Sequence, residues 1–282
     1  MKTALGKRVA KNGVAQEAFA VLPAATGLHE LAIKQANHRD VPAVSRAINV
    51  LRLLGASDVP LGVNAIATQL NAVPSTILHI LRVLVREELV SFDPESKRYA
   101  LDAGILTIAR KALRQTSFGQ RVQSSLDALS VKYGVTSVAV RVIGIEHIIV
   151  VANASSNQML QLHVEVGSRF PALMSATGRC VAAFQPYPWK EIQKKFQKIR
   201  WDTPPSLAQW TEEVEEAKKN RFSVDSGNYL AGVMVVAAPV LDRQQRITHA
   251  IVALGLNEQT KPSVRTSLCN DVRTFAQRFS EN

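Results

Sequence analysis

The chain has 282 residues, 46% of them hydrophobic, and carries 34 Lys and Arg against 23 Asp and Glu, a formal net charge of +11. This length exceeds that of a typical single domain, and the apolar fraction suffices for two cores. No uninterrupted apolar run reaches the ~20 residues that span a bilayer, and Lys7, Arg8 and Lys11 interrupt the stretch where a signal peptide would need an apolar core. We therefore expect a cytoplasmic protein with no membrane partner.

The positive charge is concentrated in the first part of the chain. Residues 1–121 carry 16 Lys and Arg against 9 Asp and Glu, a net of +7, whereas residues 122–282 carry 18 against 14, a net of +4. A basic region is attracted to the phosphate backbone of nucleic acid without reading its sequence. The two cysteines, Cys180 and Cys269, are too few and too far apart to build a metal site or a disulfide framework. We expect both to be small core residues, with no metal and no cofactor.

The first elements are an extension and two helices. Residues 1–40 show no sustained periodicity, and scattered glycines and a proline interrupt them, so we expect a disordered basic extension. Residues 42–55 predict a helix that stops at a glycine and has one apolar face, formed by Ala47, Val50, Leu51 and Leu54. Residues 61–70 predict a shorter second helix, which ends in a turn over 71–73.

The run over 73–84 is the most informative segment of the chain. Its aliphatic residues fall at i, i+3, i+4 and i+7 and form one apolar stripe, made of Ile77, Ile80, Leu81 and Leu84. Pro74 suits a first helical turn, and Ser75 and Thr76 lie beside free N–H groups that can meet a phosphate. A lone amphipathic helix is more often a solvated surface helix, so its interpretation depends on the neighbouring elements.

Two short strands follow, at 89–92 and 98–101, around a turn over 93–97. Three helices followed by a hairpin predict a winged helix-turn-helix domain over 41–102, with the third helix as the recognition helix. We expect eight residues of the recognition helix and the wing to contact DNA, namely Ser75, Thr76, Leu78, His79, Arg82, Arg86, Lys97 and Arg98.

A linker helix is expected over 103–117, and it should fix how two recognition helices lie relative to each other. Residues 118–282 then read as an α+β domain that opens with a helix at 118–133. Alternating or β-rich runs predict strands at 135–142, 147–152, 158–164, 232–241 and 247–256. Helical patterns lie at 177–184, 189–199 and 207–220.

Ordered motifs run through both halves of the chain. The first half contains Ser75-Thr76, Leu89-Val90 and Tyr99-Ala100-Leu101, and the second contains Gly167-Ser168-Arg169-Phe170-Pro171, Ser175-Ala176-Thr177-Gly178-Arg179, Val224-Asp225-Ser226-Gly227, Gly232-Val233 and Val236-Ala237-Ala238-Pro239-Val240-Leu241-Asp242. Through these motifs, residues 42–282 resemble the IclR family of transcriptional regulators. The resemblance implies a GAF-like ligand-binding fold for the second domain and small organic acids as effectors.

The resemblance also places an effector site, formed by Ser175, Ala176, Thr177, Gly178, Asp225, Val233, Val235, Val252 and Leu254. Free N–H groups where a helix begins at 176–178 would hold a carboxylate. Relatives often carry polar side chains such as serine on the last strand, where this chain has Val252 and Leu254, and an acid near Asn228. Fewer polar anchors indicate a bulkier, more apolar acid, aromatic acids included, or a degenerate pocket that binds nothing.

The sequence thus predicts a ligand-responsive regulator that binds a pseudo-palindromic double-stranded DNA operator as a homo-oligomer, at least a dimer. Where the family commonly has His-Arg, this chain has Leu78-His79, so an arginine that could pair with guanine is absent and we expect an operator richer in A·T. The alternative is a DNA-binding regulator whose C-terminal domain is only an assembly module. An enzyme would need Cys180 as a thiolate with His147 or His163 as its base, and no spacing supports this.

Overall fold

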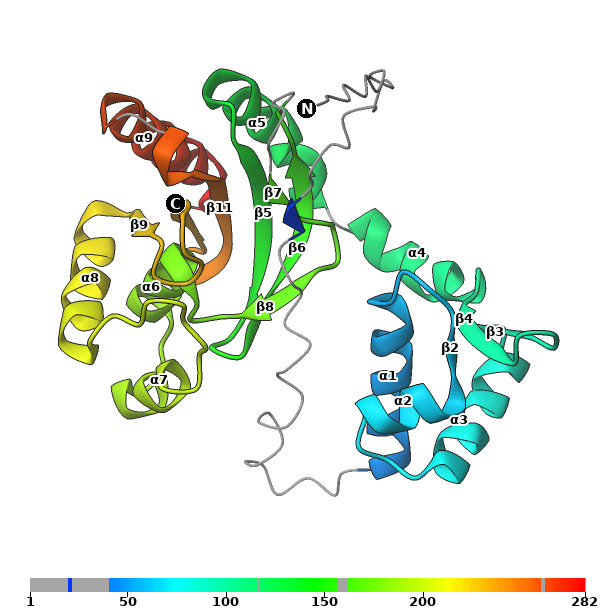
Figure 1. The fold of residues 1–282 in the computed structure, drawn as a ribbon. Helices are drawn as coiled ribbons and strands as arrows, with labels where there is room; N and C mark the ends of the chain where they lie inside the picture. Colours follow the sequence, from blue (N-terminus) through cyan, green and yellow to red (C-terminus); the bar gives the residue numbers. More distant parts are fainter. Residues whose placement is uncertain (1–19, 22–40, 116, 157–161, 260–261, 282) are drawn as a thin grey trace, which may run out of the picture. The chain divides into compact units, whose positions relative to one another are not determined.

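The computed structural model describes residues 20–21, 41–115, 117–156, 162–259 and 262–281 (Figure 1). Of these, residues 41–121 form one compact unit, and residues 122–281 together with Ala20–Val21 form another. The expected extension over 1–40 lies outside the described residues except for Ala20–Val21, which form the short strand β1.

The N-terminal unit is a winged helix-turn-helix. It contains α1 (Pro42–Gly55), α2 (Val63–Gln69), α3 (Pro74–Arg86), a sheet of β2 (Leu61–Gly62), β4 (Arg98–Leu101) and β3 (Val90–Asp93), and then α4 (Gly104–Gln115). The predicted stripe of α3 is the core of this unit: Ile77 and Leu81 are fully buried and Leu84 is nearly so. They pack in one cluster with Val50 of α1 and Ile66 of α2.

The predicted second helix is wrong at its start. Leu61 and Gly62 form β2, which pairs antiparallel with Tyr99 and Arg98 of β4, and the helix begins only at Val63. The apolar pattern of 61–70 fits a helix locally, but the partner for the backbone of Leu61 is a strand that lies 38 residues away in the sequence. Tertiary pairing therefore overrides the local pattern.

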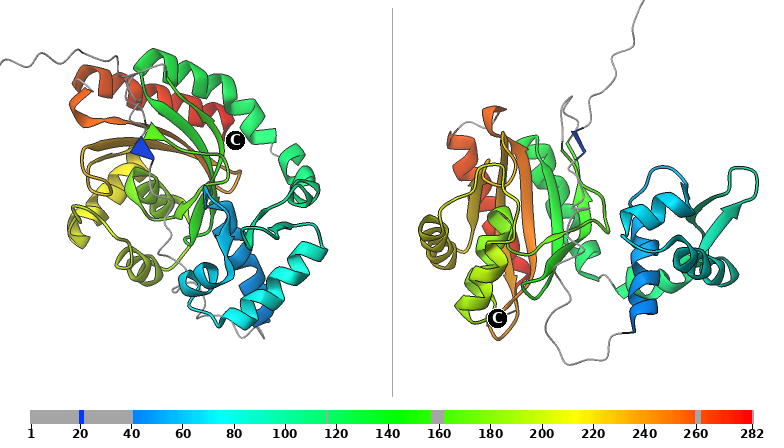
Figure 2. Two further views of the ribbon diagram at one scale, coloured as in Figure 1. Left: turned by 45° about the vertical axis from the view of Figure 1, so that its right-hand side comes forward. Right: turned by 60° about the horizontal axis from the view of Figure 1, so that its bottom comes forward.

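The C-terminal unit is built on a six-stranded antiparallel sheet in the order β8-β6-β5-β11-β10-β9. The strands are β5 (Thr136–Ile143), β6 (His147–Ala154), β8 (Arg169–Pro171), β9 (Ser223–Ser226), β10 (Val233–Leu241) and β11 (Ile247–Leu256). A two-residue strand, β7 (Leu162–His163), pairs in parallel with β1. The sheet curls, and both of its faces are covered by helices (Figures 1 and 2).

Helices α5 (Ser117–Tyr133) and α9 (Pro262–Phe279) lie side by side on one face, where Asp271 accepts hydrogen bonds of 2.7 Å from both Lys132 and Tyr133. The other face carries α6 (Ser175–Phe184), α7 (Trp189–Phe196) and α8 (Leu207–Asn220), with α6 inside the curl of the sheet. A 3-10 turn over Asn257–Gln259 follows β11. The predicted α+β class is confirmed.

Two strands of the six-stranded sheet, β8 and β9, and the helix α9 were not predicted. Both strands are short edge strands whose existence depends on pairing with a neighbour. Helix α9 buries only four of its 18 side chains, Leu268, Cys269, Val272 and Ala276, so its apolar face is narrow. The predicted strand at 158–164 falls partly outside the described residues, which resume at Leu162.

Candidate DNA-contacting face and ligand cavity

Helix α3 presents one polar face away from its core. Ser75, His79, Arg82 and Arg86 are exposed at i, i+4, i+7 and i+11, the spacing of a single helical face. Leu78 and Thr76 are partly buried at the border of this face. Pro74 occupies the first helical position, where its missing N–H is not needed. The structure thus brings the predicted DNA-contacting residues of α3 together on one surface.

The basic side chains around this face differ in whether they already form hydrogen bonds or ion pairs within the protein. Arg86 pairs with Glu87 at 3.3 Å, but both side chains are well exposed and such a pair contributes little. Arg98 donates from Nη1 to the carbonyl of Pro60 at 3.2 Å, which holds it against the β2 end of the wing sheet. Within the described residues, Arg82 makes no ion pair or hydrogen bond through its guanidinium, so its charge is available to a phosphate.

The wing turn is organised by Asp93. Its carboxylate accepts hydrogen bonds from the hydroxyl and the amide of Ser96 and from the amide of Glu95, and these bonds lower the pKa of Asp93. Lys97 follows in the left-handed region at φ 56° and is exposed. The turn therefore presents the Lys97 side chain from a backbone held by local hydrogen bonds.

A polar cleft of about 180 Å³ lies beside the start of α3 and was missed by the sequence analysis. Its walls are the turn over 70–73, Thr76 and Ile77 of α3, and Arg46 and Asn49 of α1. Periodicity assigned α1 to the core and gave no reason to examine its outer face. An exposed arginine beside the recognition helix is the signal that could have identified this cleft.

The C-terminal unit contains an apolar cavity of about 210 Å³ between the inner face of the sheet and the start of α6. The cavity is lined by Val138, Val140, Ile148, Val150, Val164, Phe170, Met174, Ser175, Thr177, Arg200, Asp202, Asp225, Tyr229, Leu230, Val233, Val235, Val252 and Leu254. Strand register explains the aliphatic wall. Val235 pairs with Leu254, Val252 with Val138 and Val140 with Val150, so alternate side chains of four strands project to the same side.

The polar groups of the cavity lie at two depths. Ser175, Thr177 and Asp225 are 1%, 3% and 1% exposed and form a deep end, whereas Arg200 and Asp202 are exposed and form the mouth. The Ser175 hydroxyl has no hydrogen-bond partner among the described residues, and its backbone lies in the left-handed region at φ 53°. A buried, unpartnered hydroxyl is costly, and a strained non-glycine residue at such a place is typical of functional sites.

Seven of the nine predicted effector residues line this cavity; Ala176 and Gly178 do not. The expectation that Gly178 offers a free N–H is wrong, because its amide donates to the carbonyl of Met174 at 2.7 Å. A Cβ at Gly178 would lie 2.0 Å from the carbonyl of Leu173, so this glycine permits close packing of the helix start. The amides at the start of α6 left without a backbone carbonyl among the described residues are those of Ser175, Ala176 and Thr177.

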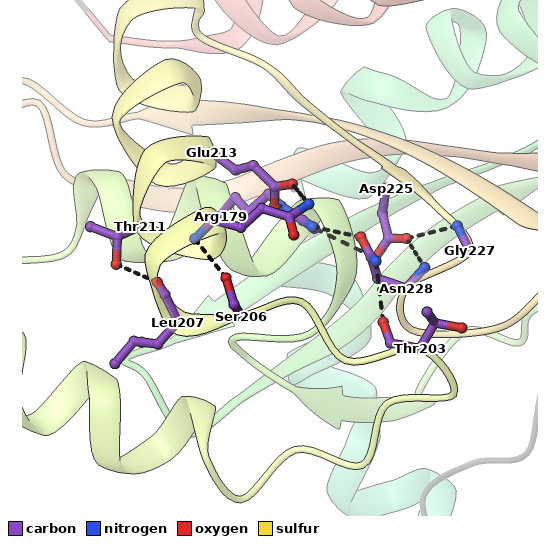
Figure 3. Close-up of polar contacts among 10 residues, drawn as sticks. Arg179, Thr203, Ser206, Leu207, Thr211, Glu213, Asp225, Gly227 and Asn228 are labelled. Atoms are coloured by element: carbon purple, nitrogen blue, oxygen red, sulfur yellow. Dashed lines mark hydrogen bonds and ion pairs between the residues drawn. The ribbon is translucent and has the colours of Figure 1, made fainter.

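A buried ion-pair network supports the deep end of the cavity (Figure 3). Arg179 is fully buried and donates to Glu213 at 2.5 Å, to Asn228 at 3.0 Å and to Asp225 at 3.5 Å. Asp225 also accepts from the amides of Gly227 and Asn228, at 3.0 and 2.8 Å. Sequence reasoning missed Arg179 because its partners lie 34 to 49 residues away.

The mouth is formed by two chain segments that bind each other. The amides of Asp202 and Thr203 donate to the carbonyls of Tyr229 and Asn228, and the Asp202 carboxylate accepts from the amide of Ala231 at 2.9 Å. The rings of Trp201 and Tyr229 meet edge to face, 6.1 Å apart. Burial raises the pKa of Tyr229, with a further contribution from the charge of Asp202.

The two cysteines are buried, as predicted, and both are free thiols. Burial raises the pKa of Cys180 to about 12, and its Sγ lies 3.5 Å from the carbonyl of Ala237. A thiol of this kind is not a nucleophile at neutral pH. In the described ranges, no helix has the length and apolarity to cross a membrane, and no three His, Cys, Asp or Glu side chains are grouped to hold a metal.

Residues 43–94 match the IclR helix-turn-helix domain, and residues 110–281 match the C-terminal domain of bacterial transcriptional regulators of the IclR type. The chain belongs to the IclR family. The resemblance inferred from the motifs is therefore confirmed, and so is a DNA-binding, transcription-regulating class for this protein. The curled sheet agrees with the GAF-like fold that the family resemblance implies.

Relatives of known name cover most of the chain. The probable transcriptional regulator SauR of Cupriavidus necator is 25% identical over 252 residues, which are 86% of this chain and 99% of that protein. The glycerol operon regulatory protein of Streptomyces griseus is 26% identical over 250 residues, 86% and 97% of the two chains. The crystal structure of an IclR transcriptional regulator from Alicyclobacillus acidocaldarius superposes with a TM-score of 0.74 at 23% identity and covers 86% of this chain and 98% of that one. The last likeness concerns the fold alone.

Proposed function

We propose that this IclR-family protein is a cytoplasmic, ligand-responsive regulator, not an enzyme, that binds a pseudo-palindromic operator as a homo-oligomer and senses a small organic acid. The observation that carries the ligand-sensing part is the apolar cavity, at whose deep end the Ser175 hydroxyl has no hydrogen-bond partner in the part of the chain that the structure describes. A cavity that serves only assembly has no need of an unsatisfied polar group at its deep end.

Recognition of the DNA sequence is assigned to Leu78, at the border of the exposed α3 face, and to His79, on that face. Leu78 can contact a thymine methyl group and His79 can donate one hydrogen bond, which favours an operator richer in A·T. Arg82 and Lys97 are assigned to phosphates. Arg82→Ala should weaken binding to all sequences alike and reduce the salt slope by about one unit, whereas His79→Ala should change sequence preference. Equal loss on a selected duplex and on random DNA for His79→Ala would contradict its assignment.

Homo-oligomerisation is supported by the size of the DNA-contacting face and by α4. One winged helix reads too little DNA for a selective operator, and two-fold pairing doubles the sequence read. Leu106 and Ile108 of α4 are large aliphatic side chains that are 63% and 67% exposed, and because they are two residues apart they lie on different sides of the helix. We assign the exposed aliphatic side chains of α4 to contacts with other copies of the chain.

The ligand-sensing function is tested by filling the cavity. A panel of aromatic and short aliphatic acids should include at least one that raises the melting temperature of the wild type and changes its affinity for a duplex selected from a random library. Val235→Phe places a larger side chain in the cavity wall and should abolish both effects. Val131→Phe makes the same change at a position that is 82% exposed on α5 and should preserve both. Equal responses of the wild type and Val235→Phe, or none in either, would favour the assembly-module alternative.

A further inference from the structure

Arg200 is the one cationic side chain among the described residues that line the cavity. It is exposed at the mouth, and no hydrogen bond or ion pair with another described residue occupies its guanidinium. Its neighbour Asp202 is held by the amide of Ala231 instead. A guanidinium without a partner among the described residues therefore lies at the mouth of a cavity whose walls are mainly apolar.

The deep end of the cavity has the opposite electrostatic character. Among the described residues, Arg179 is the only cation that pairs with Asp225, and it is shared with Glu213, so two carboxylates face one guanidinium. A ligand carboxylate placed beside Asp225 would add a third negative charge in a region of low dielectric. The three amides at the start of α6 without a backbone carbonyl among the described residues carry only partial charges, and they do not offset this repulsion as a full cation would.

We propose that Arg200 selects anionic ligands by pairing with their carboxylate at the mouth, so that the ligand enters with its uncharged end toward Ser175. This inference rests on the ligand-sensing function proposed above and reverses the orientation in which the carboxylate lies against the start of α6. The cavity of about 210 Å³ is smaller than the ~300–1,000 Å³ of pockets that hold drug-sized ligands. That size suits a small monocarboxylate with an apolar body.

The test uses acids paired with their neutral isosteres. Benzoate, phenylacetate and butyrate are each compared with the corresponding primary amide by calorimetric titration of the full-length wild type, Arg200→Ala, Arg200→Lys and Lys198→Ala. Lys198 is an exposed cation two residues earlier that does not line the cavity, which makes it the matched control. Thermal melts of each variant without ligand establish that the protein is folded.

The wild type should bind at least one acid more tightly than its amide. Arg200→Ala should weaken that acid about tenfold, the usual effect of losing a hydrogen bond between charged groups, and should leave amide binding unchanged. Arg200→Lys should recover part of the loss, and Lys198→Ala should resemble the wild type. Equal affinity of the wild type and Arg200→Ala for the acid, or a preference of the wild type for amides, overturns the role of Arg200 while leaving ligand sensing intact. A wild type that binds neither acids nor amides rejects ligand sensing itself, and this proposal with it.

Discussion

Replacing Arg179 by methionine should be among the most destabilising single changes in the C-terminal unit. Methionine keeps much of the apolar stem but removes three hydrogen bonds, to Glu213, Asn228 and Asp225. Asp225, 1% exposed, would keep its two backbone donors but no cation, and Glu213, 26% exposed at its side chain, could still reach water. The main cost therefore comes from Asp225.

The expected magnitude follows from this burial. Removing one partner of a buried ion pair costs about 3–5 kcal/mol because the other charge stays uncompensated. A domain is stable by roughly 5–15 kcal/mol in total, so Arg179→Met should lower the melting temperature by ~10 °C. Glu213→Gln should cost only about 1 kcal/mol, since its position is more exposed and the amide oxygen still accepts a hydrogen bond.

The assay is urea unfolding followed by far-UV circular dichroism, with the free energy of unfolding obtained for a double-mutant cycle. Asp225→Asn removes the charge that needs Arg179 yet keeps an oxygen that can accept from the amides of Gly227 and Asn228. The double variant should therefore be more stable than the sum of the two losses predicts, by about 1–3 kcal/mol. A loss below about 1 kcal/mol for Arg179→Met, or strict additivity in the cycle, would refute the view that Arg179 compensates Asp225.

Subunit pairing through α4 predicts that Ile108→Glu shifts the sedimenting species toward monomer at micromolar concentration; a wild type that is already a stable monomer would contradict the homo-oligomer. Burial raises the pKa of both Cys180 and Cys269. Iodoacetamide at pH 8 should therefore label neither thiol in the folded protein and both thiols in urea. Rapid labelling of Cys180 in the folded protein would count against an inert thiol. Hydrogen bonds, first that from the Ser96 hydroxyl, lower the pKa of Asp93 below its ordinary 3.8. The contribution of the Asp93 carboxylate to the stability of the wing is therefore present above pH 3.8 and lost as the pH falls through the pKa of the folded state. Carbon-13 titration of the Asp93 carboxyl should show a midpoint below 3.8, and this midpoint should rise in Ser96→Ala.

The sequence by itself determined the elements whose signal is local. The 3.6-residue stripe of α3 requires that Ile77 and Leu81 share a face, and the side opposite to a buried stripe is exposed in any fold that buries it. The same reasoning located α1, β10 and β11, because each carries its apolar pattern within one uninterrupted segment. The family resemblance added seven of the eighteen residues that line the cavity, including the paired positions Val235 and Leu254.

The tertiary structure alone decided which distant segments meet. Strand β2 exists because the backbone of Leu61 finds β4, and the Arg179 network exists because α6, α8 and the segment after β9 converge on one buried guanidinium. Arg200 lines the cavity because the nearby residues Asp202 and Thr203 are hydrogen-bonded to Tyr229 and Asn228. Hydrogen bonds and ion pairs of this kind depend on distances in space. Local sequence patterns do not specify the distances between segments that are far apart in the sequence.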